Sequence, residues 1–275
     1  MIKLFNYIPR DSAVHDLTGA AKLVCMLCWT LAAMITFDTR YLIALSIAAF
    51  LLFRVSKIKL SEVKILLIFS LVFVLLNNVL IYVFSPEHGV TIYGTRTVLA
   101  HLIGRYTITS QQLLYNLNVF LKYTATIPIV LLFVSTTHPS EFAASLNKIG
   151  VSYRVSYSVS LALRYIPDII KEFHDISLAQ QARGIELSGK ENLFKRLKGA
   201  TAILMPLILS SLDRIEVVST AMELRCFGKE NKRTWYRGRD FKASDYLIFA
   251  LGALLIAASI ALNVLNGGRY WNPFV

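Results

Sequence analysis

Long apolar runs separated by short polar stretches dominate the first half of the chain and return at its end. A helix needs about 20 mostly apolar residues to cross a bilayer, and five runs come near that length. The second run is short, so we expect its helix to tilt or to borrow flanking residues. The pattern predicts an all-α integral membrane protein with about five spans, at Ala20–Phe37, Tyr41–Val55, Val63–Phe84, Asn118–Thr136 and Tyr246–Leu265.

The connections between the runs carry local signals of their own. Asp38–Arg40 is short enough for a tight hairpin between the first two spans. In the longer connection Ser85–Gln111, strand-like composition at Val90–Tyr93 and Tyr106–Thr109 predicts a small β-hairpin. The run Thr109-Ser-Gln-Gln fits a capping box that would begin the fourth span.

Between the fourth and fifth spans the sequence predicts helices of a different kind. A short helix begins at Pro139 and ends at Gly150. Two long helices follow, each with one internal proline that should kink it. They run from about Arg154 to Arg183 and from about Glu191 to Phe227, with prolines at Pro167 and Pro206 and stop signals at Gly184 and Gly228.

The apolar parts of these two helices, Val155–Leu163 and Ala200–Leu212, are too short to cross a membrane. We therefore predict that both helices leave the bundle and project their charged second halves into the cytoplasm. The expected organisation is a four-span bundle at residues 1–136, a cytoplasmic helical region at 137–244, and a last span at 245–275.

The distribution of charge predicts the orientation. The chain carries a net charge of +12, although only 17% of its residues are charged. With the N-terminus inside, nearly all the lysines and arginines face the cytoplasm, as the positive-inside rule requires. The outer segments then hold only Arg40, Arg96, Arg105 and Arg269. Because the basic residues flank membrane segments, nucleic-acid binding is disfavoured as the reason for the charge.

Both ends of the chain agree with this orientation. Residues 1–19 contain no apolar core, so no cleavable signal peptide is expected and the first span should be retained. An odd number of spans places the C-terminus outside. There Tyr270, Trp271 and Phe274 would form an aromatic anchor at the outer interface.

A repeated arginine pattern marks the ends of the two long helices. Ser177-x-Ala179-x3-Arg183 recurs further along the chain as Ser219-x-Ala221-x3-Arg225. Each arginine continues an apolar stripe at steps of three or four, so it lies on the same helix face as that stripe. Such an arginine suits a carboxylate partner in a partly dry groove. A last-turn arginine can also simply favour the helix dipole, but the paired occurrence favours an interface.

These stretches resemble the signature motifs of energy-coupling factor (ECF) transporter T components. In that family an X-Arg-X motif ends each of two coupling helices. The corresponding residues here are Ala182, Arg183 and Gly184 in the first motif, and Leu224, Arg225 and Cys226 in the second. The first is similar to the usual Ala-Arg-Gly, whereas the second has Leu and Cys in place of small residues. The N-terminal stretch Asp16–Lys22 resembles the family's Leu-Asp-Pro-Arg-x-Lys pattern only loosely and lacks its proline.

The resemblance implies a non-catalytic subunit of an ABC importer in the cell membrane. Two ABC-type ATPase subunits would each receive one coupling helix, with its arginine in a salt bridge. A separate small membrane subunit, the S component, would bind the substrate, a vitamin or a metal ion, and would tilt when the ATPases close. The chain itself would need no cofactor.

Other signals are weaker. Gly184-x4-Gly189-Lys190 resembles part of a P-loop, but Glu191 replaces the required Ser or Thr and no strand precedes it. Cys25 and Cys28 lie in an apolar run without further ligands, so we interpret them as small hydrophobic residues. The five histidines are scattered and predict no metal site.

A self-contained secondary transporter stays as the alternative, although it predicts inverted repeats and interrupted spans. A membrane enzyme would need catalytic residues that the sequence does not offer.

Overall fold

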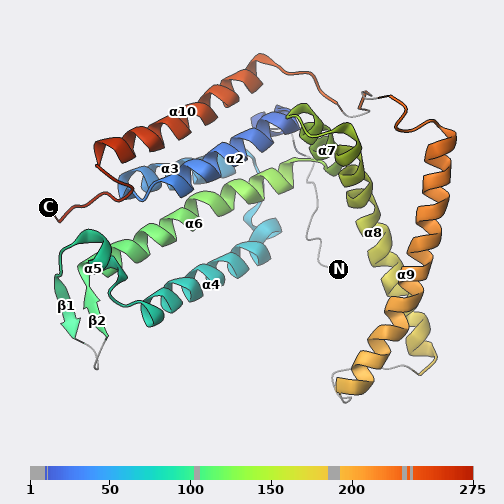
Figure 1. The fold of residues 1–275 in the computed structure, drawn as a ribbon, viewed down its shortest axis with the longest axis horizontal. Coiled ribbons are helices and arrows are strands. Elements are labelled where there is room, and N and C mark those ends of the chain that lie inside the picture. Colours follow the sequence, from blue (N-terminus) through green and yellow to red (C-terminus); the bar gives the residue numbers. More distant parts are fainter. Residues whose placement is uncertain are drawn as a thin grey trace. The chain divides into compact units, whose positions relative to one another are not determined.

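The computed structural model describes residues 10, 12–101, 106–184, 193–230, 234–235 and 238–274, and nearly all of its regular structure is helical (Figure 1). It confirms the all-α fold class. The elements, in chain order, are α1 (Ala13–Asp16), α2 (Gly19–Ile35), α3 (Thr39–Val55), α4 (Leu60–Phe84), α5 (His88–Tyr93), β1 (Val98–His101), β2 (Thr107–Thr109), α6 (Ser110–Thr136), α7 (Pro139–Lys148), α8 (Tyr153–Ala182), α9 (Leu193–Leu224) and α10 (Ala243–Leu265).

The chain forms two compact units. The membrane unit comprises the residues up to His138 together with those from Arg239 onward, and the helix-pair unit comprises Pro139–Gly238. Within the described ranges, three helices are long and apolar enough to cross a bilayer, namely α4, α6 and α10, while α2 is apolar but shorter. The chain is therefore an all-α membrane protein, and the total of five spans stays a prediction.

The core of the membrane unit lies where α2, α3 and α6 meet, and α10 packs along α2 (Figure 1). Trp29 at its centre is 2% exposed and donates its indole N–H to the carbonyl of Ala125, 3.0 Å away. Fully buried alanines and leucines of α2 and α3 surround it. Gly252 lets α10 approach α2 closely, because a Cβ there would lie 3.1 Å from the Cβ of Cys28. The two apolar-run cysteines thus lie in helix α2 as expected, and Cys28 is a packing residue.

Helix α4 differs from its neighbours because it packs mainly against α6. In its most apolar stretch only 6% of the residues are buried. The exposed side chains away from α6 are aliphatic or aromatic, as in Ile65, Phe69 and Leu76. Lipid is the solvent that such a surface requires.

The connection between α4 and α6 corrects part of the sequence prediction. Residues 90–93, predicted as a strand, belong to helix α5, and β2 pairs with β1 instead, in antiparallel register. Helix α6 begins at Ser110, where the capping signal at Thr109 predicted its start, and so extends eight residues ahead of the apolar run Asn118–Thr136. Thr109 caps it by accepting from the N–H of Gln112, but the Gln112 side chain accepts from Gly89 rather than closing a capping box. The contact between Gly89 and the start of α6 therefore overrides both the strand-like composition of residues 90–93 and the capping box at Gln112.

Tight packing joins the C-terminal residues to the α2–α3 connection. Asp38 caps α3, its side chain is fully buried, and it accepts hydrogen bonds from Arg40 and Asn266. Burial alone would raise the pKa of Asp38, but these hydrogen bonds outweigh it and hold the pKa below its usual value. The stabilisation is thus present above a pH of about 4 and is lost in stronger acid. Nearby, the ring of Tyr270 stacks on that of Phe37, with the two ring centroids 4.7 Å apart. This aromatic side chain therefore packs inside the membrane unit.

Candidate functional site

The helix-pair unit is built on α8 and α9, which run antiparallel to each other. At one end Arg154 donates to the carbonyl of Gly228 at 3.1 Å. Towards the other end the Gln180 side chain donates to the carbonyl of Ala202 at 3.2 Å. The end of each helix therefore lies beside the beginning of the other.

A polar contact joins the two helices between these points. Glu172 accepts from Arg214 at 2.7 Å and also from the hydroxyl of Ser210. The sequence offset from Glu172 to Arg214 is the same as the offset from Arg183 to Arg225. The contact therefore joins two positions that stand at the same distance before the two arginines.

The first arginine motif forms the end of α8. The helix ends at Ala182, and Arg183 occupies the C-cap position. Gly184 follows in the left-handed region with φ of +85°, and its N–H donates to the carbonyl of Gln181 at 2.9 Å. Glycine adopts this conformation at no steric cost. The predicted stop at Gly184 is thus confirmed, and its backbone conformation explains why this residue type suits the third motif position.

The second motif forms the end of α9 in the same way. The N–H of Phe227 donates to the carbonyl of Met222 at 2.9 Å, and that of Cys226 donates to Glu223 at 2.8 Å. This pair of bonds is a Schellman motif, whose left-handed residue is usually glycine. Here that residue is Cys226, with φ of +52°. Cys226 thus holds the position of Gly184, and α9 ends three residues earlier than predicted.

Replacing Cys226 with glycine should stabilise the end of α9. A non-glycine residue in the left-handed region costs about 1–2 kcal/mol, and the greater freedom of glycine in the unfolded chain offsets part of that. We expect a net gain of about 0.5–1 kcal/mol, measured as slower amide exchange over residues 222–227. Gly184→Ala is the matched control and should speed exchange at the end of α8. Faster exchange in Cys226→Gly would contradict the strain argument.

The residues of both motifs are accessible to a partner. Ala182, Arg183, Leu224 and Arg225 are all exposed, and Leu224 retains 81% of its accessible surface. Because α8 and α9 are antiparallel, the two arginines lie at opposite ends of the pair. At the helical rise of about 1.5 Å per residue they are roughly 35 Å apart. The structure therefore does not bring the predicted site residues together, but presents two separate ends.

An aromatic cluster fixes the end that carries Arg225. Phe227 lies 4.5 Å from Tyr157, and Trp235 lies 5.3 Å from Tyr153, between ring centroids. The Trp235 indole also donates to Asn147 of α7 at 3.1 Å. Sequence reasoning missed this cluster, because its members come from separated segments of the chain. The local signal that could have found it was the aromatic Phe227 directly after the motif.

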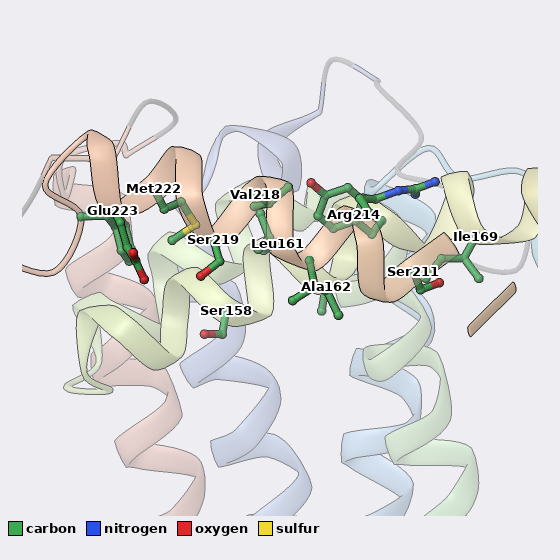
Figure 2. Close-up of a pocket in the computed structure, with 13 residues that line it drawn as sticks. Ser158, Leu161, Ala162, Ile169, Ser211, Arg214, Val218, Ser219, Met222 and Glu223 are labelled. Atoms are coloured by element: carbon green, nitrogen blue, oxygen red, sulfur yellow. The ribbon is translucent and has the colours of Figure 1, made fainter. Parts of the chain in front are cut away.

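The apolar stripes predicted on the two long helices meet in a groove between them. Figure 2 shows Ile169 of α8 and Ser211, Val218 and Met222 of α9 lining this groove, whose volume is about 450 Å³. The stripe is only partly covered, since Ile215 on the same wall is 63% exposed. An apolar surface left open in this way is typical of a protein-binding face.

The remaining sequence signals are the P-loop-like stretch, the possible metal ligands and the two helix prolines. Most of the P-loop-like stretch, from residue 185 to 191, lies outside the described residues. Within the part of the chain that the structure does describe, no three potential metal ligands gather at one place. Pro167 and Pro206 do lie inside α8 and α9.

Together these features define a class of protein, an all-helical membrane protein with a second unit whose antiparallel helices end in exposed arginines. The profile of the cobalt transport protein family (CbiQ) matches residues 10–235. Because the match covers most of the chain, the protein belongs to this family. The resemblance to ECF transporter T components is thereby confirmed.

Individual relatives agree over nearly the full length. The chain is 29% identical over 270 residues to the energy-coupling factor transporter transmembrane protein EcfT of Bacillus selenitireducens, with 95% of this chain and 97% of the relative covered. It is 29% identical over 278 residues to the protein of the same name from Staphylococcus aureus, covering 95% and 96%. For the Thermotoga maritima protein the identity is 27% over 277 residues, covering 97% and 93%. Family membership places the chain among the membrane components of transporters.

Proposed function

We propose that this protein is the coupling subunit of an ECF-type importer in the cell membrane. It would link ATP hydrolysis by two ABC-type ATPase subunits to the movement of a separate substrate-binding subunit. The observation that carries the proposal is the pair of exposed Arg183 and Arg225 ends on antiparallel helices. Two equivalent ends that point to opposite sides suit two similar partners, one at each end.

The chemistry of each helix end suits binding to a groove on an ATPase subunit that is lined by carboxylates. The guanidinium group offers a planar fork that a carboxylate can accept in two hydrogen bonds. Beside each arginine stands a small or apolar residue, Ala182 or Leu224, that can enter a partly dry groove. The six motif residues identified from the sequence, at positions 182–184 and 224–226, therefore form the proposed ATPase contacts.

The open groove between α8 and α9 supports contact with the substrate-binding subunit. Its exposed aliphatic side chains need a covering surface of the same kind. The cargo belongs to that other subunit. The family description favours cobalt, and vitamins or nickel are the other candidates from the resemblance. A secondary transporter is the alternative, and it would require a polar cargo site within the membrane unit.

Affinity purification of the tagged chain from its host membrane tests the assignment directly. We expect two ATPase subunits and one small membrane protein to accompany it, with ATP hydrolysis present in the complex. The chain purified alone should hydrolyse no ATP. Stoichiometric hydrolysis by the isolated chain would contradict the proposed role, and uptake by the isolated chain in vesicles would favour the alternative.

The proposed orientation makes a separate prediction. In a cysteine-free variant, a single cysteine at exposed Leu99 should react with an impermeant thiol reagent added to intact cells. Cysteines at exposed Ser61 and Lys229 should react only after the cells are opened. Labelling of Lys229→Cys in intact cells would overturn the topology, with the cytoplasmic N-terminus and five spans that we propose.

A further inference from the structure

The chain passes between its two units twice, once after His138 and once before Arg239. Inside the membrane unit, hydrogen bonds tie the residues next to both passages to the same short N-terminal segment, directly from Arg239 at the second passage and through Lys22 of α2 at the first. That segment is α1 with its neighbours Ser12 and Leu17, and we call it the N-terminal brace.

Lys22 holds the first passage. Its side chain is only 5% exposed although it lies in an apolar helix. The ammonium group donates to the carbonyl of Thr136, the last residue of α6, at 3.0 Å, and to the carbonyl of His15 in the brace at 3.4 Å. A buried cation is costly unless it is paired in this way. The carbonyls at a helix C-terminus are its favoured partners.

Arg239 and Asp245 hold the second passage. Arg239 is the first residue of the returning chain, and its guanidinium donates to the same His15 carbonyl at 3.3 Å. Six residues later Asp245 is fully buried. Its two oxygens accept from the N–H of Thr18, at 3.0 Å, and of Lys242, at 2.8 Å. The start of α10 is thus tied to the residue that caps α2.

The brace is itself fixed in place. The hydroxyl of Ser12 lies 2.7 Å from Nδ1 of His15, and both residues are buried. The carbonyl of His15 therefore has a defined position, and it accepts from Lys22, which binds the first passage, and from Arg239 of the second.

We infer that Lys22 is a positioning residue for energy coupling, because with the His15 carbonyl it joins both passages into one joint at the start of α2. A displacement of the helix-pair unit then reaches α2, α6 and α10 together rather than through two independent linkers. The inference rests on the proposed function for its biological meaning. The joint itself can be tested without it.

Amide hydrogen exchange on the purified complex tests the joint. In Lys22→Met, which keeps the length and removes the charge, exchange should rise about tenfold over residues 133–138, as expected for loss of a hydrogen bond to a charged group. It should rise over residues 239–245 as well, although these belong to the other passage. Lys64→Met, the same change on the exposed surface of α4, should alter neither. Lys22→Arg should restore part of the protection.

A reciprocal variant covers the case in which Lys22→Met does not fold. Arg239→Gln removes the other donor at an exposed position and should raise exchange over residues 133–138. If either folded variant changes exchange only on its own side, the two passages are independent and the inference is wrong.

A non-hydrolysable ATP analogue, added to the purified complex, tests whether the joint takes part in energy coupling. In the native complex the analogue should change the protection of residues 12–22, and in Lys22→Met that change should be lost while ATPase subunits still co-purify. An unchanged response in Lys22→Met would overturn the positioning role. Failure of any ATPase to co-purify with the native chain would instead overturn the proposed function and leave the exchange test of the joint standing.

Discussion

Replacing both Arg183 and Arg225 with alanine should abolish ATP-driven uptake while leaving the chain folded in the membrane. If each arginine pairs with a carboxylate in an ATPase groove, removing it leaves the opposite charge stranded and costs about 2–5 kcal/mol per contact. That corresponds to a weakening of roughly 30-fold to several thousand-fold at each end. Uptake of cobalt, nickel and the candidate vitamins by host cells, together with co-purification of the ATPases, measures the effect.

The controls separate docking from general loss of charge. Arg164→Ala removes an exposed arginine from the middle of α8 and should leave uptake unchanged. Lysine at position 183 or 225 should restore little, because an ammonium group cannot reproduce the two-pronged contact of arginine. A double alanine variant that is expressed normally and transports at the wild-type rate would show that both arginines are ordinary solvated helix ends.

Gly89→Ala should strongly destabilise the segment between α4 and α6. A Cβ at this position would lie 2.5 Å from the main-chain oxygen of Gln111 and 2.6 Å from the nitrogen of Gln112. Neither backbone atom can move without displacing the start of α6, so we expect a loss of at least about 1–3 kcal/mol. The Gly89 hydrogen bond to Gln112 should break as well. Thermal unfolding of the purified chain in detergent, followed by circular dichroism, measures the loss.

Gly268→Ala is the matched control for this change. Gly268 also lies outside the helices, after the end of α10, but a Cβ there meets nothing within 4 Å. The unfolding midpoint of this variant should therefore stay within a degree or two of the native value, as for a surface change. An equal shift in both variants would mean that loss of glycine flexibility, and not the close approach to α6, decides the outcome.

Periodicity and stop signals predicted most of the helical architecture. The apolar runs correspond to α2, α3, α4, α6 and α10, and Gly184 stands where α8 ends, whereas α9 ends at Leu224, ahead of the predicted stop at Gly228. These features follow from local chemistry, so one sequence suffices to find them. The predicted strand at residues 90–93 was wrong for the opposite reason. Its β-favouring composition is overridden by the close contact of Gly89 with α6.

The candidate site was only half predictable. The repeated serine, alanine and arginine spacing located both arginine ends, and each forms a left-handed helix stop. Their placement at opposite ends depends on long-range bonds such as Arg154 to Gly228, which no local pattern reports. The pairing of Glu172 with Arg214 could have been suspected from the offset of the repeat, since the two residues are separated by the same offset as Arg183 and Arg225.

The contact between Glu172 and Arg214 lies midway between the two arginine ends of the helix pair. The sequence separation between Glu172 and Arg183 equals the separation between Arg214 and Arg225. The two arms are therefore equal, about 16 Å each at the helical rise. If the two helices turned by equal and opposite angles about this contact, both arginines would move through equal arcs. If each end binds an ATPase subunit as proposed, a force applied at either end would act over the same lever arm.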